Sequence, residues 1–113
     1  MTIKDFRKLC KENNAMDYAM VIVNSRAKEE CPFTARSLRV NSDLENVEIH
    51  FNTNNKLVDY TNDYMTVEEF LKWAGSFKNY NIKIVDIAYT WLGEFDVKFW
   101  FWDEDKVVQL YFI

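Results

Sequence analysis

The sequence predicts an α+β fold, with a mainly antiparallel sheet of about six strands and two short helices packed on one of its faces. Two segments have the apolar spacing of amphipathic helices, and segments of alternating apolar and polar residues follow each of them. The 113 residues include only two glycines and one proline, which favours regular elements joined by short polar turns. With 49% hydrophobic and 17% aromatic residues, the composition excludes a disordered chain and suits one domain, 1–113, with one core.

Both predicted helices begin with the same pattern, in "MTIKDFRKLCKENN" from residue 1 and "MTVEEFLKWAGSFKN" from residue 65. Thr2 and Thr66 are placed to cap the helices, and Asp5 and Glu69, three residues later, are placed to complete capping boxes. Gly75 suits the position just past the second helix. The apolar faces correspond position by position, as Ile3, Phe6, Leu9 and Cys10 in the first helix and Val67, Phe70, Trp73 and Ala74 in the second.

A strand and then a hairpin follow each helix. The predicted strands are 17–25 and 81–91, and the predicted hairpins, 38–51 and 99–112, align with each other without a gap. The sequence therefore predicts two αβββ-like repeats with an approximate twofold relation. Their bounds are 1–51 and 65–113, with the connection 52–64 between them.

The second hairpin is expected to pair across a four-residue turn, Asp103 to Lys106. The predicted pairs are Trp102–Val107, Phe101–Val108, Trp100–Gln109, Phe99–Leu110, Lys98–Tyr111 and Val97–Phe112. Because alternate pairs share a face, one face is entirely apolar and the other carries Trp100, Trp102, Tyr111, Val107, Lys98 and Gln109. In the same register the first hairpin pairs Val40–Val47, Leu38–Ile49, Arg39–Glu48, Ser37–His50 and Asn41–Asn46. Its outer face is then polar, which predicts an ordinary solvated face.

The outer face of the second hairpin is the main functional signal in the sequence. Polar positions of the first hairpin correspond to Trp100, Trp102 and Tyr111 in the second. Trp and Tyr are common interface anchors because they bury a large area and keep a polar group. Three interpretations remain open: the 52–64 connection or a helix covers the rings, two copies of the chain meet through them, or another molecule docks on them.

Charged residues flank these aromatic rings. Asp103, Glu104 and Asp105 occupy the turn, and Lys98 lies on the same face. Three carboxylates beside two tryptophans suit an Arg- or Lys-rich surface, although a solvated turn is the simpler interpretation. The mixed-charge segment 25–37 is expected to be an irregular loop, either a recognition loop or a plain connection.

Several functional classes are disfavoured. A net charge of −4 and a pI near 5.0 argue against binding to nucleic acid, which relies on clustered Lys and Arg. No apolar run reaches the length of a membrane span and no signal peptide is readable, so we expect a cytoplasmic protein. Cys10 and Cys31 lack metal-ligand spacing, and Cys10 is expected to be buried. His50, the single histidine, is expected to be a half-exposed strand residue. With no phosphate loop, metal motif or nucleophile–base pair, the sequence predicts no catalysis, metal or cofactor.

In size, acidic charge and lack of catalytic residues, the chain is similar in general type to two kinds of small inhibitor. These are the anti-defence (anti-CRISPR-like) proteins of phages and mobile elements and the immunity proteins that neutralise toxins. Together with the difference between the two hairpins, that similarity leads us to expect a non-enzymatic protein that blocks a basic enzyme, such as a nucleic-acid-handling enzyme of a bacterial defence system or a toxin. The partner-binding residues would be Trp100, Trp102, Tyr111, Asp103, Glu104, Asp105 and Lys98. The alternative is a homo-oligomer whose aromatic faces form the subunit interface and a small-ligand site.

Overall fold

The structure, a computed structural model of the chain, describes residues 1–24, 29–31, 37–51 and 64–112. Two α-helices, one 3-10 helix and seven strands form in these residues, which gives the predicted α+β class. In chain order they are α1 (Ile3–Glu12), β1 (Ala19–Asn24), β2 (Glu29–Cys31), β3 (Leu38–Asn41), β4 (Asn46–Phe51), α2 (Val67–Ala74), β5 (Asn81–Asp86), η2 (Ile87–Leu92), β6 (Glu94–Trp102) and β7 (Val107–Phe112).

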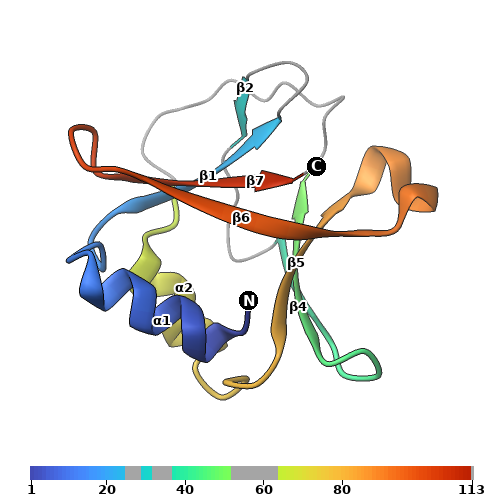
Figure 1. The fold of residues 1–113 in the computed structure, drawn as a ribbon. Helices are drawn as coiled ribbons and strands as arrows, with labels where there is room; N and C mark the ends of the chain where they lie inside the picture. The colour runs from blue at the N-terminus through green and yellow to red at the C-terminus, as the bar shows by residue number, and fades with distance from the viewer. Residues whose placement is uncertain (25–28, 32–36, 52–63, 113) are drawn as a thin grey trace.

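The seven strands form one mixed sheet in the order β2-β1-β7-β6-β5-β4-β3. Four neighbouring pairs are antiparallel, as predicted, and two, β1 with β7 and β4 with β5, are parallel. Each parallel pair joins a strand that follows one helix to a hairpin from the other half of the chain. The sheet bends strongly, so that β6 and β7 run across β4 and β5 in Figure 1.

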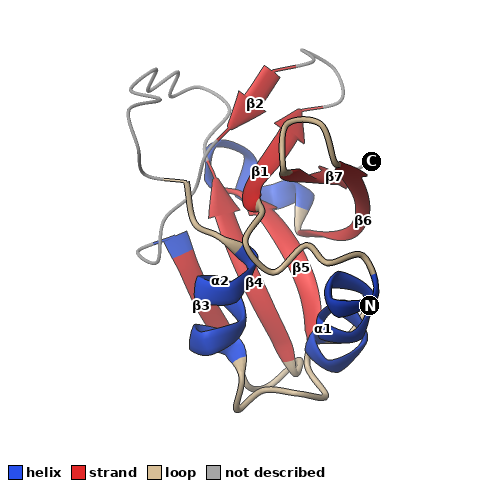
Figure 2. Ribbon diagram, turned by 90° about the vertical axis from the view of Figure 1, so that its left-hand side faces the viewer, coloured by secondary structure: helices blue, strands red, loops and turns tan. Residues whose placement is uncertain are grey.

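Both helices lie on the same face of the bent sheet, as the views in Figure 1 and Figure 2 show. Phe6 of α1 is fully buried, stacks on Phe99 of β6 with ring centroids 4.5 Å apart, and meets Phe70 of α2 edge-on at 5.9 Å. One apolar cluster joins these helices to alternate residues of β1, β4, β5 and β7. The core therefore lies between the helices and the inner face of the sheet, and the outer face is left for other contacts.

The helix caps form where the sequence predicted them. The Thr2 hydroxyl accepts a hydrogen bond from Asp5 N at 3.2 Å, and Thr66 accepts one from Glu69 N at 3.2 Å. At α2 the Glu69 side chain also accepts the Thr66 N–H, which completes the capping box. Gly75 is the C-cap of α2, but its φ of −60° is an ordinary helical value that needs no glycine.

The two halves make matching contacts with each other. Isolated bridges join Thr2 to Asn81 and Thr66 to Ala19, so the residue that caps each helix pairs with the strand that follows the other helix. The backbone hydrogen bonds repeat this pattern. Ile3 N donates to Tyr80 O at 3.0 Å, and the matching Val67 N donates to Tyr18 O at 2.9 Å. In the same way, Ile82 N donates to Met1 O at 3.0 Å, and Met20 N donates to Met65 O at 2.8 Å. The duplication of one αβββ unit stays a prediction.

The structure corrects two expectations about the strands. The predicted strand 81–91 ends at Asp86, whose carboxylate accepts a hydrogen bond from Ala88 N at 3.0 Å and so caps η2. Segment 25–37, expected to be an irregular loop, contains β2, which pairs with β1 and raises the number of strands to seven. Of the predicted 52–64 connection, only Tyr64 lies among the described residues.

Candidate partner-binding site

The second hairpin has the predicted register. All six predicted pairs between β6 and β7 are present, from Trp102–Val107 to Val97–Phe112. Phe99 points to the helices and stacks on Phe6, so residues two apart from it belong to the core side. Trp100, Trp102 and Tyr111 consequently lie on the outer face of the sheet, and we call these three residues the aromatic face.

The tryptophans of the aromatic face are accessible. Trp100 is 59% exposed and Trp102 is 45% exposed, whereas Tyr111 is half-buried. The helices pack on the opposite side of the sheet, so they do not cover these rings. Lys98, the cation predicted to belong to the site, is exposed on the same face of β6.

One amide oxygen fixes two of the rings. Trp102 Nε1 donates a 2.6 Å hydrogen bond to Gln109 Oε1, and the Tyr111 hydroxyl donates to the same oxygen. Both rings are therefore held by a side chain of the same hairpin. An interface built on rings that are already positioned loses less side-chain entropy on binding.

The acidic turn, Asp103 to Lys106, is tied to the first half of the chain. The Tyr18 hydroxyl donates a 2.8 Å hydrogen bond to Asp103 Oδ1. This hydrogen bond to the carboxylate raises the pKa of Tyr18 above its ordinary value, and burial raises it further. Lys106 Nζ forms an ion pair with Asp17 Oδ2 at 3.6 Å. The backbone of Lys106 has a positive φ of 53°. All three predicted carboxylates are exposed, and that of Asp103 is engaged by the Tyr18 hydroxyl.

A hollow of about 230 Å³ lies beside the aromatic face. Trp102, Asp105, Val107 and Gln109 of the second hairpin line it together with Ala19 and Val21 of β1 and with Tyr64. Sequence reasoning missed the last three residues because it did not predict the parallel pairing of β1 with β7. No local sequence signal marks these residues, because the pairing joins segments that lie far apart in the chain.

The first hairpin also has the predicted register, but its outer face differs from the prediction. Leu38–Ile49, Arg39–Glu48, Val40–Val47 and Asn41–Asn46 pair as expected, whereas Ser37 precedes the first residue of β3. The predicted solvated face is wrong at Asn46, which is 4% exposed and donates to Glu94 Oε2 at 2.8 Å. Glu94 comes from β6 in the other half of the chain, so a hairpin considered alone does not suggest this contact.

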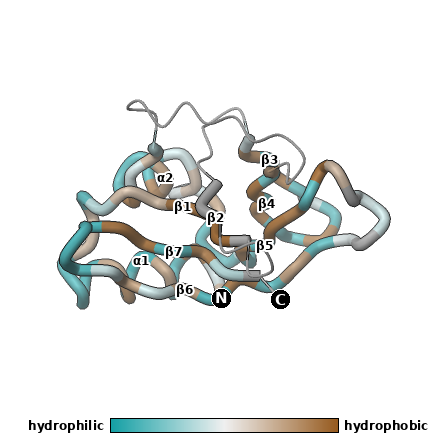
Figure 3. Tube along the Cα trace, turned by 90° about the horizontal axis from the view of Figure 1, so that it is seen from above, coloured by the Kyte–Doolittle hydropathy of each residue, from teal (hydrophilic) through white to brown (hydrophobic). Residues whose placement is uncertain are grey.

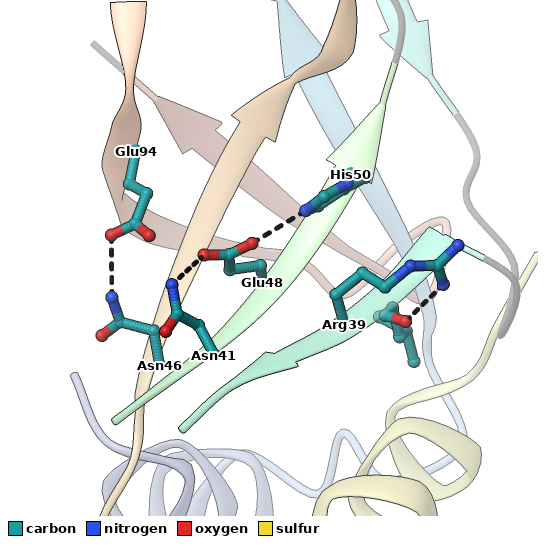
Figure 4. A network of polar contacts seen from close by, with 7 residues as sticks. Arg39, Asn41, Asn46, Glu48, His50 and Glu94 are labelled. Atoms are coloured by element: carbon teal, nitrogen blue, oxygen red, sulfur yellow. Dashed lines mark hydrogen bonds and ion pairs between the residues drawn. The ribbon is translucent and has the colours of Figure 1, made fainter. Parts of the chain in front are cut away.

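A polar network connects β3, β4 and β6 on this face (Figure 4). Glu48 accepts a hydrogen bond from Asn41 Nδ2 at 3.3 Å, and its other carboxylate oxygen lies 2.9 Å from His50 Nε2. Burial raises the pKa of Glu48, but hydrogen bonds with Glu94, His50 and Asn41 outweigh it and leave that pKa below its ordinary value. The hydrogen bond to Glu48, with burial, raises the pKa of Glu94. The two pKa values therefore move apart, so that Glu48 favours its charged form and Glu94 its protonated form.

The described residues offer little for catalysis. Within residues 1–24, 29–31, 37–51 and 64–112, no three His, Cys, Asp or Glu side chains are grouped to hold a metal ion. His50 is partly buried and bonded to Glu48, which agrees with the expected half-exposed strand residue. Cys10 is enclosed by the core as predicted, and burial raises the pKa of its thiol to about 12. The absence of an enzymatic activity stays a prediction.

Comparisons of the chain with protein-family models, with curated proteins and with solved structures find no match. Among the described residues, neither α1 nor α2 nor η2 has the length and apolar character of a membrane-spanning helix.

Proposed function

We propose that this chain is a non-enzymatic protein that binds a basic protein through the aromatic face and the acidic turn, and blocks its activity. The observation that carries the proposal is the exposure of Trp100 and Trp102, at 59% and 45%, on one face of a fully paired hairpin. The other face of that hairpin packs on the core, so the rings stand on a rigid support. A contiguous exposed aromatic patch on a small protein is a common mark of an interaction surface.

Energetics favour these rings as anchors. Burying a tryptophan removes a large apolar area from water, and anchor residues of this type typically contribute about 2 kcal/mol or more to binding. Gln109 already holds Trp102 and Tyr111, so little further ordering is needed on binding.

Charge favours a basic partner. Glu104 and Asp105 are exposed on the turn, and the chain carries a net charge of −4. Complementary charge at the edge of an interface mainly increases the rate of association, whereas the buried rings slow dissociation. Nucleic-acid-handling enzymes have basic surfaces of this kind. The proposal therefore groups this chain in type with anti-CRISPR-like anti-defence proteins and toxin-immunity proteins.

We also infer that the two halves are copies of one αβββ unit that have diverged on the outer face. The matching bridges of Thr2 with Asn81 and Thr66 with Ala19 support this. In the first half the outer face is filled by a polar network around Glu48, and in the second it carries exposed tryptophans. A surface that differs in this way between matching hairpins favours a binding role over a packing role.

A double variant tests the proposal. Trp100→Ala with Trp102→Ala should leave the fold unchanged, because both rings are exposed, and should weaken binding to the basic partner by about 100-fold or more. The matched control is Trp91→Ala, which removes a 75% exposed tryptophan from η2, at the opposite end of β6 from the acidic turn in Figure 1.

The measurement is capture of partner proteins from host lysate, followed by titration of the purified partner and assay of its activity. We expect wild type and Trp91→Ala to bind and inhibit equally, in a salt-dependent manner, and the double variant to do neither. Unchanged capture by a folded double variant contradicts the proposal.

A homo-oligomer is the second candidate, and the exposed aromatic face is also the observation that favours it. Two copies meeting through this surface form an isologous interface in which each turn contributes three carboxylates against Lys98 and Lys106. That excess of negative charge makes a second copy a poorer match than a basic protein. Sedimentation equilibrium at micromolar concentration separates the two, because a monomeric wild type excludes the oligomer.

A further inference from the structure

The hollow beside Trp102 is a second feature of the surface around the second hairpin. It is about 230 Å³ in volume and opens next to the aromatic face. Val21, which is almost fully buried, and Val107 give it apolar lining from the adjacent strands β1 and β7. Trp102 and Tyr64 add aromatic rings, and Asp105 adds a carboxylate.

The residues of the hollow are held from both sides. Trp102 Nε1 donates to Gln109 Oε1 at 2.6 Å, which fixes the indole within the hairpin. The acidic turn that carries Asp105 is fixed through Asp103, which accepts the Tyr18 hydroxyl bond at 2.8 Å. The indole ring and the turn that carries Asp105 are therefore positioned before any ligand arrives.

A polar network occupies the corresponding place in the other half of the fold. Val21 pairs with Gln109 across β1 and β7, and in the matching parallel pair Lys83 lies opposite Glu48 across β5 and β4. There, side-chain hydrogen bonds fill the surface: Asn41 to Glu48, Asn46 to Glu94 and Lys83 to Asp96. When the two hairpins are aligned, Trp102 of the second corresponds to Asn41 of the first. The hollow lies at the place that matches the polar network.

We propose that this hollow binds an arginine side chain of the basic partner. This inference rests on the proposed function and names the chemistry that the site recognises. The apolar stem of the arginine lies along Val21 and Val107, the planar guanidinium stacks against Trp102 or Tyr64, and Asp105 accepts its hydrogen bonds.

Charge and shape select arginine among possible occupants. An apolar side chain would desolvate Asp105 without giving it a partner, and an anion would meet the acidic turn. A lysine carries the right charge, but its ammonium group is strongly hydrated and has no plane to stack on a ring. Only arginine matches the apolar lining, the aromatic rings and the carboxylate together.

The test is an NMR titration of the full chain with blocked arginine, N-acetyl-arginine-N-methylamide. The chain has four tryptophans, so it gives four indole N–H signals, and Trp102→Phe identifies the one that reports on the hollow. We expect saturable shifts of the Trp102 signal, with an affinity in the millimolar range typical of a single side chain. Blocked lysine should bind more weakly and blocked citrulline, the neutral isostere, should not bind.

Two charge-matched variants separate a specific contact from a general field. Asp105→Asn should weaken arginine binding about tenfold, because it removes a charge-assisted hydrogen bond. Asp43→Asn makes the same charge change in the exposed turn of the first hairpin and should leave binding unchanged. Absence of a saturable Trp102 shift, or an equal loss in both variants, overturns the inference.

The inference and the proposed function fail in different ways. If the folded Trp100→Ala/Trp102→Ala variant keeps the partner, the proposed function is wrong. If wild type and Asp105→Asn capture the partner with equal affinity while the double variant does not, the aromatic face binds the partner. In that case the inference that the hollow binds an arginine is wrong.

Discussion

The Tyr18 hydroxyl donates a 2.8 Å hydrogen bond to Asp103 Oδ1, so the residue before β1 holds the turn between β6 and β7. The two residues are 85 positions apart in the sequence. One of the three carboxylates of the acidic turn is therefore engaged within the chain, and Glu104 and Asp105 are left to face solvent. The turn appears hydrophilic at the left of Figure 3, beyond the more hydrophobic stretches of the strands.

The first prediction concerns this hydrogen bond. Because Asp103 accepts a hydrogen bond from the Tyr18 hydroxyl, the pKa of Tyr18 lies above its ordinary value. The bond therefore stabilises the fold fully at pH values below the ordinary tyrosine pKa. Its contribution is lost as the pH rises through the folded-state pKa and the phenol ionises. Asp103→Asn should lower the pKa of Tyr18, measured as the difference in tyrosinate absorbance between each protein and its Tyr18→Phe counterpart. An unchanged difference titration contradicts this assignment.

The second prediction concerns the core. Phe6→Ala removes a fully buried ring that stacks on Phe99 and meets Phe70, and should lower the free energy of unfolding by about 3–5 kcal/mol. Denaturation in urea measures this change. Leu44→Ala, at a residue that is 60% exposed, should stay within about 0.5 kcal/mol of wild type. Equal losses for the two variants would place Phe6 outside the core.

The third prediction concerns the carboxyl pair Glu48 and Glu94. The raised pKa of Glu94 means that its protonated form stabilises the fold fully below the ordinary glutamate range, and this contribution is lost as the pH rises through the folded-state pKa. The lowered pKa of Glu48 acts oppositely: its contribution is present above the ordinary range and lost as the pH falls through the folded-state pKa. Glu94→Gln imitates the protonated form at every pH.

We therefore expect Glu94→Gln to be more stable than wild type at neutral pH, and this advantage to shrink at about pH 4. Urea midpoints at the two pH values measure it. Glu45→Gln, in the exposed turn of the first hairpin, controls for the change in net charge. A pH-independent difference, or an equal effect of both variants, contradicts the raised pKa of Glu94.

The fourth prediction concerns Cys10. Its thiol is fully enclosed by the core, and burial raises its pKa to about 12, so almost no reactive thiolate is present at neutral pH. In a Cys31→Ser background, a disulfide reagent should label Cys10 only at the rate at which the protein unfolds. Rapid labelling of the folded protein would disprove burial of this thiol.

The surface of the second hairpin was predictable because its strand pairing depends only on residues that are close together in the sequence. A four-residue turn between alternating segments fixes the pairing of Trp102 with Val107, and every later pair follows from it. The caps Thr2 and Thr66 were predictable for the same reason, since each needs only the next few residues.

The contacts between the halves were not predictable from local pattern. The parallel pair of Val21 with Gln109 joins residues far apart in the sequence, and no turn or capping residue marks it. The hollow, and with it Tyr64, was missed for this reason. The burial of Asn46 was missed in the same way, because its partner Glu94 comes from a strand of the other half.

The parallel pairing of β1 with β7 also bears on synthesis of the chain. As residues leave the ribosome in order, β1 emerges early, but the strand that lies beside it is built from residues 107–112. Until those residues appear, β1 has the three-residue β2 as its neighbour in the sheet. Completion of the sheet must therefore wait until residues 107–112 have been made, which leaves the apolar strand β1 without its parallel neighbour for much of translation.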